Sequence, residues 1–272
     1  MQLVDIGANL THSGFQHDLP EVVQRARHAG VALLIITGTT VEESRHAASI
    51  ADTYGLYSTA GVHPHHAKDC DENTIAALRE IAAHPRVVAI GECGLDYNRN
   101  YSPHPDQEKW FVAQAELGLS LDKPLFLHSR DAHPRFSQIV KEMKIEKAVA
   151  HCFTGEREEL HAYLDLGLYI GITGWICDER RGRHLVGLVR DIPRDRLLLE
   201  TDAPYLTPRD LHPQPKARRN EPAFLPHIAR AVACALGRPV EDVAAEATRN
   251  AIRLFGLHEP RSPSPSQRAL AA

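Results

Sequence analysis

The sequence has few of the features that accompany secreted or membrane proteins. Its five cysteines form no Cys-x-x-Cys pair, and an odd number without regular spacing indicates free thiols in a reducing compartment. The first ten residues, MQLVDIGANL, hold no basic segment ahead of an apolar one, and apolar runs such as VALLII are far too short to span a bilayer. We therefore expect a cytoplasmic protein without a membrane anchor.

An excess of positive charge is also missing. The net charge is −4, which excludes a basic body that coats nucleic acid non-specifically, so a polyanionic substrate would have to be held by local groups. With 272 residues, 43% of them hydrophobic, the chain can bury a large core without disulfide or metal staples. We expect one domain over residues 1–258, active as a monomer without an obligate protein partner. The Pro/Ser-rich tail 259–272 has the composition of a disordered segment.

Strand-like segments alternate with helix-like segments along almost the whole chain. The spacers between the strands repeat apolar residues at intervals of three and four, as amphipathic helices do. Eight strands, each followed by a helix-length spacer, predict an α/β fold, a closed parallel (β/α)8 TIM barrel. Two further helices are expected near 222–236 and 240–255. The predicted strands span residues 3–9, 31–38, 56–62, 87–93, 124–129, 147–153, 168–174 and 196–202.

Polar side chains stand at the carboxyl ends of these strands, where barrels of this type place their chemistry. A single histidine there is more often a structural residue. Several ionisable groups at one rim, however, are costly to bury unless something pairs them. A divalent cation such as Mg²⁺, Mn²⁺ or Zn²⁺ would do so, since imidazole and carboxylate groups are its usual ligands. The strand-end residues are Asp5, Asn9, His63, Glu92, His128, His151, Thr173 and Asp202.

The stretch VVAIGECGLDY places Glu92 directly after a buried apolar run. A carboxylate at this point is explained if it faces a cation, and Gly91 and Gly94 would let backbone and ligand approach closely. The segment GVHPHH offers His63 and His65 as further candidates, either as functional groups or as histidines of a surface loop. Cys93 and Cys152 follow proposed ligands directly, and the alternation of a strand would point both sulfurs toward the helices.

Longer motifs follow one another in a characteristic order. These are DIGANLTHSGF, GVHPH, GECGLDY, LHSRDAH, AHCFTG, LLLETDAPYL, RNEPAFLPHI and ATRNAIRLFG. Together they resemble the TatD family of metal-dependent deoxyribonucleases over everything but the tail. The resemblance implies a TIM-barrel metallohydrolase, a Mg²⁺-dependent 3′-5′ exonuclease acting on single-stranded DNA, with RNA as a further substrate left open, and associated with DNA repair.

The resemblance also implies roles for individual residues. Matching motifs make Glu92, His128 and His151 the metal ligands, with Asp202 as a further ligand or the catalytic base, so that Glu92 and Asp202 are the catalytic carboxylates. The wider family begins strand one with Asp-x-His-x-His, whereas this chain has DIGAN, with Gly7 and Asn9 at the histidine positions. A second tightly bound metal is therefore in doubt. Asp5 and Asn9 could still offer oxygens to a weakly held Mg²⁺.

Substrate binding requires positive charge near this rim. Candidates are Arg130, two residues past His128, and the basic segments DERRGRH and PKARRNEP, the latter with Arg218 and Arg219. These arginines either contact phosphates or pair with neighbouring acids. Trp175 and Tyr205 could stack a base or pack at the rim. The predicted substrate-binding residues are His63, His65, Arg130, Asn9, Arg218 and Arg219.

Two other functions fit a barrel of this kind. An amide or lactone hydrolase would normally use the strand-one histidine pair and often a modified lysine on strand four, where this chain has Glu92. A catalytically silent binding barrel is suggested only by the missing histidine pair, and the rest of the predicted ligand ring opposes it.

Overall fold

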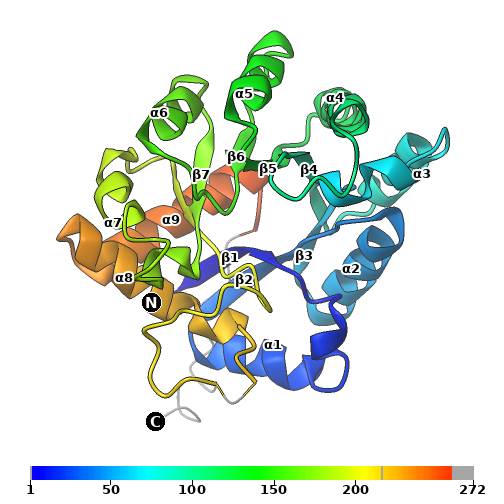
Figure 1. The fold of residues 1–272 in the computed structure, drawn as a ribbon. Coiled ribbons are helices and arrows are strands. Elements are labelled where there is room, and N and C mark those ends of the chain that lie inside the picture. Colours follow the sequence, from blue (N-terminus) through cyan, green and yellow to red (C-terminus); the bar gives the residue numbers. More distant parts are fainter. Residues whose placement is uncertain (1, 216, 259–272) are drawn as a thin grey trace.

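The computed structural model describes residues 2–215 and 217–258. The tail 259–272, which the sequence predicts to be disordered, lies outside the described residues. Eight parallel strands pair in chain order to form one sheet (Figure 1). They are β1 (Leu3–Ala8), β2 (Val31–Ile36), β3 (Tyr57–Ala60), β4 (Val87–Asp96), β5 (Leu125–Arg130), β6 (Ala148–Ala150), β7 (Tyr169–Ile172) and β8 (Leu197–Leu199).

The sheet closes between its first and last strands. Ala8 forms a parallel bridge with Ala203, and the backbone N–H of Asp202 donates to Gly7 O at 2.8 Å. Inside this seam Asp5 is fully buried, and its carboxyl group accepts the backbone N–H of Thr201 at 2.9 Å and the Thr201 hydroxyl at 2.6 Å. The predicted (β/α)8 TIM barrel is confirmed.

Helices surround the strands on the outside (Figure 1). Local sequence explains their limits: the Thr40 hydroxyl caps the start of the second helix, and Gly55, with φ of 68°, ends it in the left-handed conformation that glycine adopts easily. The α-helices are α1 (Leu19–His28), α2 (Val41–Tyr54), α3 (Thr74–Ala82), α4 (His104–Ser120), α5 (His133–Glu142), α6 (Arg157–Asp165), α7 (Leu185–Leu188), α8 (Leu225–Leu236) and α9 (Val240–Phe255). Short 3₁₀ helices are η1 (Ser13–Phe15), η2 (Pro64–Asp69), η3 (Gly174–Cys177), η4 (Val189–Asp191) and η5 (Pro222–Phe224).

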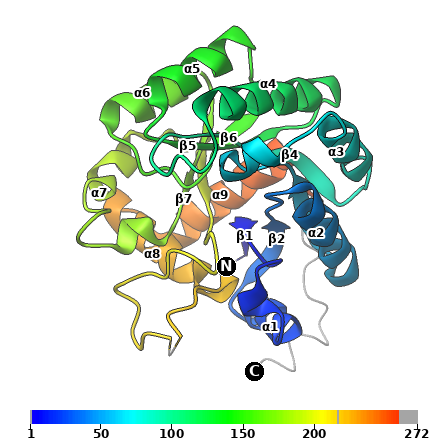
Figure 2. The same cartoon turned by 45° about the vertical axis from the view of Figure 1, so that its right-hand side comes forward.

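The apolar core has two parts. The larger part lies between the strands and the surrounding helices. The smaller fills the barrel with one or two residues from each strand, including Phe126 of β5, and continues into Leu254 and Phe255 at the end of α9. This last helix lies behind the strands in both views (Figures 1 and 2). The barrel is therefore filled and covered at the end where the strands begin, which leaves the other end for a site.

Neither a membrane helix nor a disulfide is found in the described part of the chain. Among residues 2–215 and 217–258, no helix is long and apolar enough to cross a bilayer. All five cysteines lie within these residues and are free thiols.

Two glycines face each other where the third and fourth strands meet. A Cβ atom on Gly61 would lie 2.4 Å from the carbonyl carbon of Gly91. Because the atoms in the way belong to the backbone, no side-chain rotation could relieve the clash. The backbone directly before Glu92 is thus held against the strand that precedes His63.

We predict that Gly61→Ala lowers the free energy of unfolding by about 1–3 kcal/mol, the usual cost of overpacking. Urea denaturation followed by circular dichroism measures this change. Gly187→Ala is the matched control, because a Cβ on Gly187 in α7 meets nothing within 4 Å. The free energy of unfolding of this control should equal that of the parent or exceed it by up to about 1 kcal/mol, because alanine favours a helix more than glycine does. Equal stability of Gly61→Ala and the parent would contradict the packing described.

Candidate active site

A cavity of about 500 Å³ opens at the carboxyl ends of the strands. Its walls come from the ends of all eight strands and the segments that follow them, so the closed barrel gathers residues that are far apart in the chain, such as Asn9 and Asp202. Eight of the residues named from the sequence as ligands, catalytic groups or substrate contacts line it: Asn9, His63, His65, Glu92, His128, Arg130, His151 and Asp202.

Glu92 occupies the centre of this group. Its Oε1 lies 2.7 Å from His151 Nε2, 2.9 Å from His128 Nδ1 and 3.3 Å from His63 Nε2, and the residue is only 5% exposed. Burial by itself would raise the pKa of Glu92, but the neighbouring charges of His151 and His63 and the hydrogen bonds of the imidazoles hold it well below its usual range. The carboxylate is therefore ionised and surrounded by imidazole rings.

His63 is oriented by its own loop. It caps the start of η2, and its Nδ1 accepts the backbone N–H of His65 at 3.0 Å, so Nε2 is the nitrogen that faces Glu92. Burial lowers the pKa of His63 to about 4. At neutral pH the ring is thus uncharged, which is the form that binds metals.

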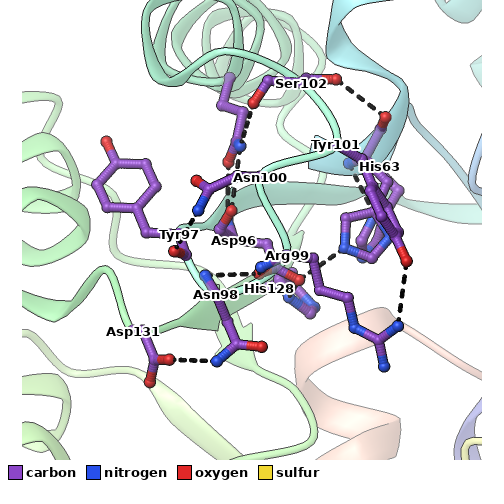
Figure 3. Close-up of polar contacts among 12 residues, drawn as sticks. His63, Asp96, Tyr97, Asn98, Arg99, Asn100, Tyr101, Ser102, His128 and Asp131 are labelled. Atoms are coloured by element: carbon purple, nitrogen blue, oxygen red, sulfur yellow. Dashed lines mark hydrogen bonds and ion pairs between the residues drawn. The ribbon is translucent and has the colours of Figure 1, made fainter.

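Asp96 is a second buried carboxylate, which the sequence analysis missed. Its Oδ2 lies 2.6 Å from His65 Nε2 and 3.4 Å from His128 Nε2, and its Oδ1 accepts the N–H groups of Asn98 and Arg99 (Figure 3). Burial would raise the pKa of Asp96, but hydrogen bonds with the two imidazoles lower it. The available signal was strand alternation: β4 extends to Asp96, four residues beyond Glu92 and on the same face.

Glu200 is the other acid that the sequence analysis missed. It is fully buried. Its Oε1 accepts the backbone N–H of Cys152 at 2.5 Å, and its Oε2 lies 3.4 Å from His151 Nδ1. Two glycines leave room for this carboxylate, because a Cβ on Gly7 or Gly171 would lie 2.6 or 2.4 Å from its oxygens. Glu200 thus orients the His151 ring from the side opposite Glu92.

Asp202 forms another wall of the cavity. Burial raises the pKa of its carboxyl group to about 7, and Asn9 Nδ2 donates a hydrogen bond to its Oδ1 at 2.9 Å. The backbone of Asp202 has a φ of 55° and its N–H is held by Gly7. Asp5, by contrast, turns its oxygens to Thr201 and does not line the cavity, so it is not placed to offer an oxygen to a metal there.

The donor groups fit a divalent metal. One nitrogen each of His63 and His128 and one oxygen of Glu92 lie within 4.8 Å of one another. His128 Nε2 is buried, and apart from the contact with Asp96 Oδ2 at 3.4 Å it has no hydrogen-bond partner among the described residues. Imidazole and carboxylate ligands suit Mg²⁺, Mn²⁺ or Zn²⁺. The cavity therefore offers a His/Glu site for a divalent ion. His63, predicted to bind substrate, lies among the possible ligands of that ion.

Cationic and aromatic groups form the outer part of the cavity. The Arg181 guanidinium lies 4.4 Å and that of Arg130 5.9 Å from the centre of the Trp175 ring. Tyr101 and Tyr205 line the same space with exposures of 54% and 51%. These five side chains can contact phosphates and bases.

The two arginines of the PKARRNEP segment lie outside the cavity wall. Arg218 lines an adjoining groove. Arg219 forms ion pairs with Asp18 at 2.7 Å and Glu221 at 2.6 Å. The role of both in substrate binding stays a prediction.

The prediction for Cys152 is wrong, whereas that for Cys93 is confirmed. Cys93 is fully buried in the core between strands and helices. Cys152 instead lines the cavity, because β6 ends at Ala150 and the φ of Cys152 is 46°. Strand alternation no longer applies there.

Comparison with known proteins agrees with this geometry. A sequence model of the family described as TatD related DNase matches residues 4–256. Proteins named 3′-5′ ssDNA/RNA exonuclease TatD from Erwinia amylovora and Musicola paradisiaca are 54% and 52% identical to the chain, covering 94% of it and 100% and 98% of the relatives.

Solved structures show the same fold. A TatD homologue from Escherichia coli K12 superposes with a TM-score of 0.87 at 26% identity, and a TatD family hydrolase from Entamoeba histolytica with 0.86 at 28%. Each comparison covers 94% of this chain and 98% of the other. With its ring of acids and imidazoles at the end of the barrel, the chain belongs to the TatD related DNase family.

Proposed function

We propose that the chain is a metal-dependent phosphodiesterase that removes nucleotides from the 3′ end of single-stranded DNA, and of RNA. The observation that carries this proposal is Glu92, ionised among three imidazoles, in a cavity whose outer wall holds arginines and aromatic rings. The names of the relatives support the substrate and the direction. We further propose Mg²⁺ as the metal, a cytoplasmic monomer with one domain over residues 1–258, and a role in DNA repair.

Three side chains would hold the metal, Glu92, His128 and His151, with Asp202 as a further ligand or as the base and His63 beside them. When bound, a divalent cation supplies Lewis-acid stabilisation of the phosphate and makes a water more acidic. Glu200 fixes the orientation of His151. Asp96 does the same for His128 and His65.

Asp202 is the proposed base. Its raised pKa of about 7 suits a group that must both accept and release a proton near neutral pH. The hydrogen bond from Asn9 leaves one carboxylate oxygen free to take the proton of the attacking water. The other predicted catalytic carboxylate, Glu92, is held by its imidazole partners and acts as a ligand.

The substrate would be held by the outer wall. Arg130 and Arg181 can contact backbone phosphates, and Trp175 and Tyr205 can stack on bases. The volume of about 500 Å³ lies in the range of small-ligand sites, which suits a terminal nucleotide of a single strand better than a duplex. The adjoining groove with Arg218 would lead the strand away.

The direct test uses single-stranded DNA labelled at its 5′ end, with Mg²⁺ or with chelator. We expect a ladder of labelled products that shorten progressively from the 3′ end and that disappear with chelator. Duplex DNA of the same sequence is the comparison and should be degraded more slowly. No shortening, combined with turnover of amide or lactone substrates, would overturn the proposal.

Removing either catalytic carboxylate should abolish turnover without unfolding the barrel. We expect Asp202→Asn to lower kcat by about 10²–10⁴-fold, the range for general acid–base catalysis, and Glu92→Gln to lower it at least as much. Glu179→Gln changes an exposed carboxylate that pairs with Arg209 and should keep full activity. Circular dichroism checks the fold, and loss of structure in both variants would indicate a structural role instead.

Arg130→Gln should weaken binding of single strands and reduce its salt dependence. Removing one phosphate contact lowers the slope of log K against log salt by about 0.7 on single strands. Fluorescence anisotropy at several salt concentrations, with Ca²⁺ present to slow cleavage, measures the slope. Arg45→Gln, which breaks an exposed ion pair with Glu80, is the control. An unchanged slope for Arg130→Gln would place Arg130 outside the phosphate contacts.

A further inference from the structure

A second group of metal-binding side chains lies outside the cavity. Cys177 Sγ, an Asp210 carboxylate oxygen and a His227 ring nitrogen all lie within 4.8 Å of one another. His227 Nε2 is 2.7 Å from Asp210 Oδ1. None of the three lines the cavity that holds Glu92, and none has a part in the proposed reaction. His227 belongs to the motif RNEPAFLPHI, whose histidine the proposed chemistry leaves unused.

Three separate segments meet at this group. Cys177 is the last residue of η3, which follows β7; Asp210 lies in the loop after β8; and His227 is in the first turn of α8. Cys177 is 6% exposed, while the side chains of Asp210 and His227 are 55% and 21% exposed. The thiol is thus at the edge of the core, and the other two donors lie on its solvent side, where an ion can enter.

We propose that Cys177, Asp210 and His227 bind a divalent transition metal of the zinc type at a site separate from the Glu92 cavity. Thiolate, imidazole and carboxylate are the ligands that Zn²⁺ takes in proteins, and water completes a tetrahedron where the protein gives three. The thiolate selects against Mg²⁺, which prefers oxygen ligands.

The distances are compatible with this coordination. Zinc bonds of about 2.0–2.3 Å place tetrahedral ligand atoms about 3.4–3.6 Å apart. The three donors, within 4.8 Å of one another, reach that arrangement by shifts of about 1 Å. Burial, and then the Asp210 carboxylate, raise the pKa of the Cys177 thiol. Binding would therefore break the S–H bond, form a sulfur–metal bond and release the proton to solvent.

A metal here would tie together the loops that carry the outer wall of the cavity. Cys177 lies between Trp175, which lines the cavity, and Asp178, which pairs with Arg181 at 3.1 Å. Asp210 is next to Arg209, which also contacts Asp178, at 3.6 Å. The ion would link the β7 and β8 loops to α8 and hold Trp175 and Arg181 in place. It would not take part in the chemistry.

The test is a titration of metal-free protein with Co²⁺, which replaces Zn²⁺ and reports thiolate ligands by a sulfur-to-cobalt charge-transfer band in the near ultraviolet. We expect the band in the parent protein, reaching its full intensity by about two equivalents because the Glu92 cavity also takes Co²⁺. It should vanish in Cys177→Ser. In His227→Ala the band should appear only at higher Co²⁺ concentration. The loss of affinity should exceed the roughly 10–100-fold that follows loss of an outer-shell partner, because His227 would be a direct ligand.

Matched controls separate this site from the Glu92 cavity. Cys152→Ser changes the cysteine that lines the cavity, and Cys234→Ser changes an exposed cysteine of α8. Both should keep the band. No band in the parent, or a band that persists in Cys177→Ser, would overturn the proposal. Because the band reports sulfur coordination alone, this result is independent of the nuclease assay.

Thermal unfolding gives a second readout for variants that fold. Because a ligand that binds only the native state stabilises it, Zn²⁺ should raise the unfolding midpoint of Cys152→Ser, whose cluster is intact. Zn²⁺ should raise the unfolding midpoint of Cys177→Ser clearly less, because in this variant only the Glu92 cavity can still bind the ion. Equal shifts in the two variants would contradict a Cys177 site.

Discussion

The site depends on one buried charge. An ionised carboxylate with 5% exposure, as in Glu92, would cost several kcal/mol if it stood alone. Imidazoles at 2.7, 2.9 and 3.3 Å offset that cost. These rings come from the ends of β3, β5 and β6, which only a closed barrel brings around the end of β4. The Glu92 carboxylate needs these imidazoles when no metal is bound, and the same negative charge would attract a cation.

Missing side chains are as necessary to this arrangement as the acids. Gly7 stands where the wider family has a histidine, and here the space that its side chain would occupy holds an oxygen of Glu200. That carboxylate orients His151 from behind. Gly7 on β1 thus leaves room for a buried acid after β8, and Asn9 donates its amide N–H to Asp202.

The sequence predicts this fold well because strand ends and spacers repeat so regularly. The expectation that functional residues stand at the carboxyl ends of strands identified Glu92 on β4 and His128 on β5. It did not find Asp96, which lies four residues beyond Glu92 on β4, or Glu200, which lies after β8 and is identified only by its contacts with His151 and Cys152. It misplaced Cys152, where a positive φ ends the alternation. Local pattern thus predicts which rim a residue reaches, and packing decides which way it points.

The two groups of potential ligands differ in what surrounds them. Around Glu92 the walls are open to a substrate, with Arg130 and Arg181 ready to hold phosphates. Around Cys177 the packed core lies on one side and solvent on the other, and none of Cys177, Asp210 and His227 lines the cavity that holds Glu92. At the first proposed site a cation would act on a bound molecule, whereas at the second it would hold loops together. With these proposed tasks at separate sites, the rim would be rigid while the reacting metal kept positions free for substrate.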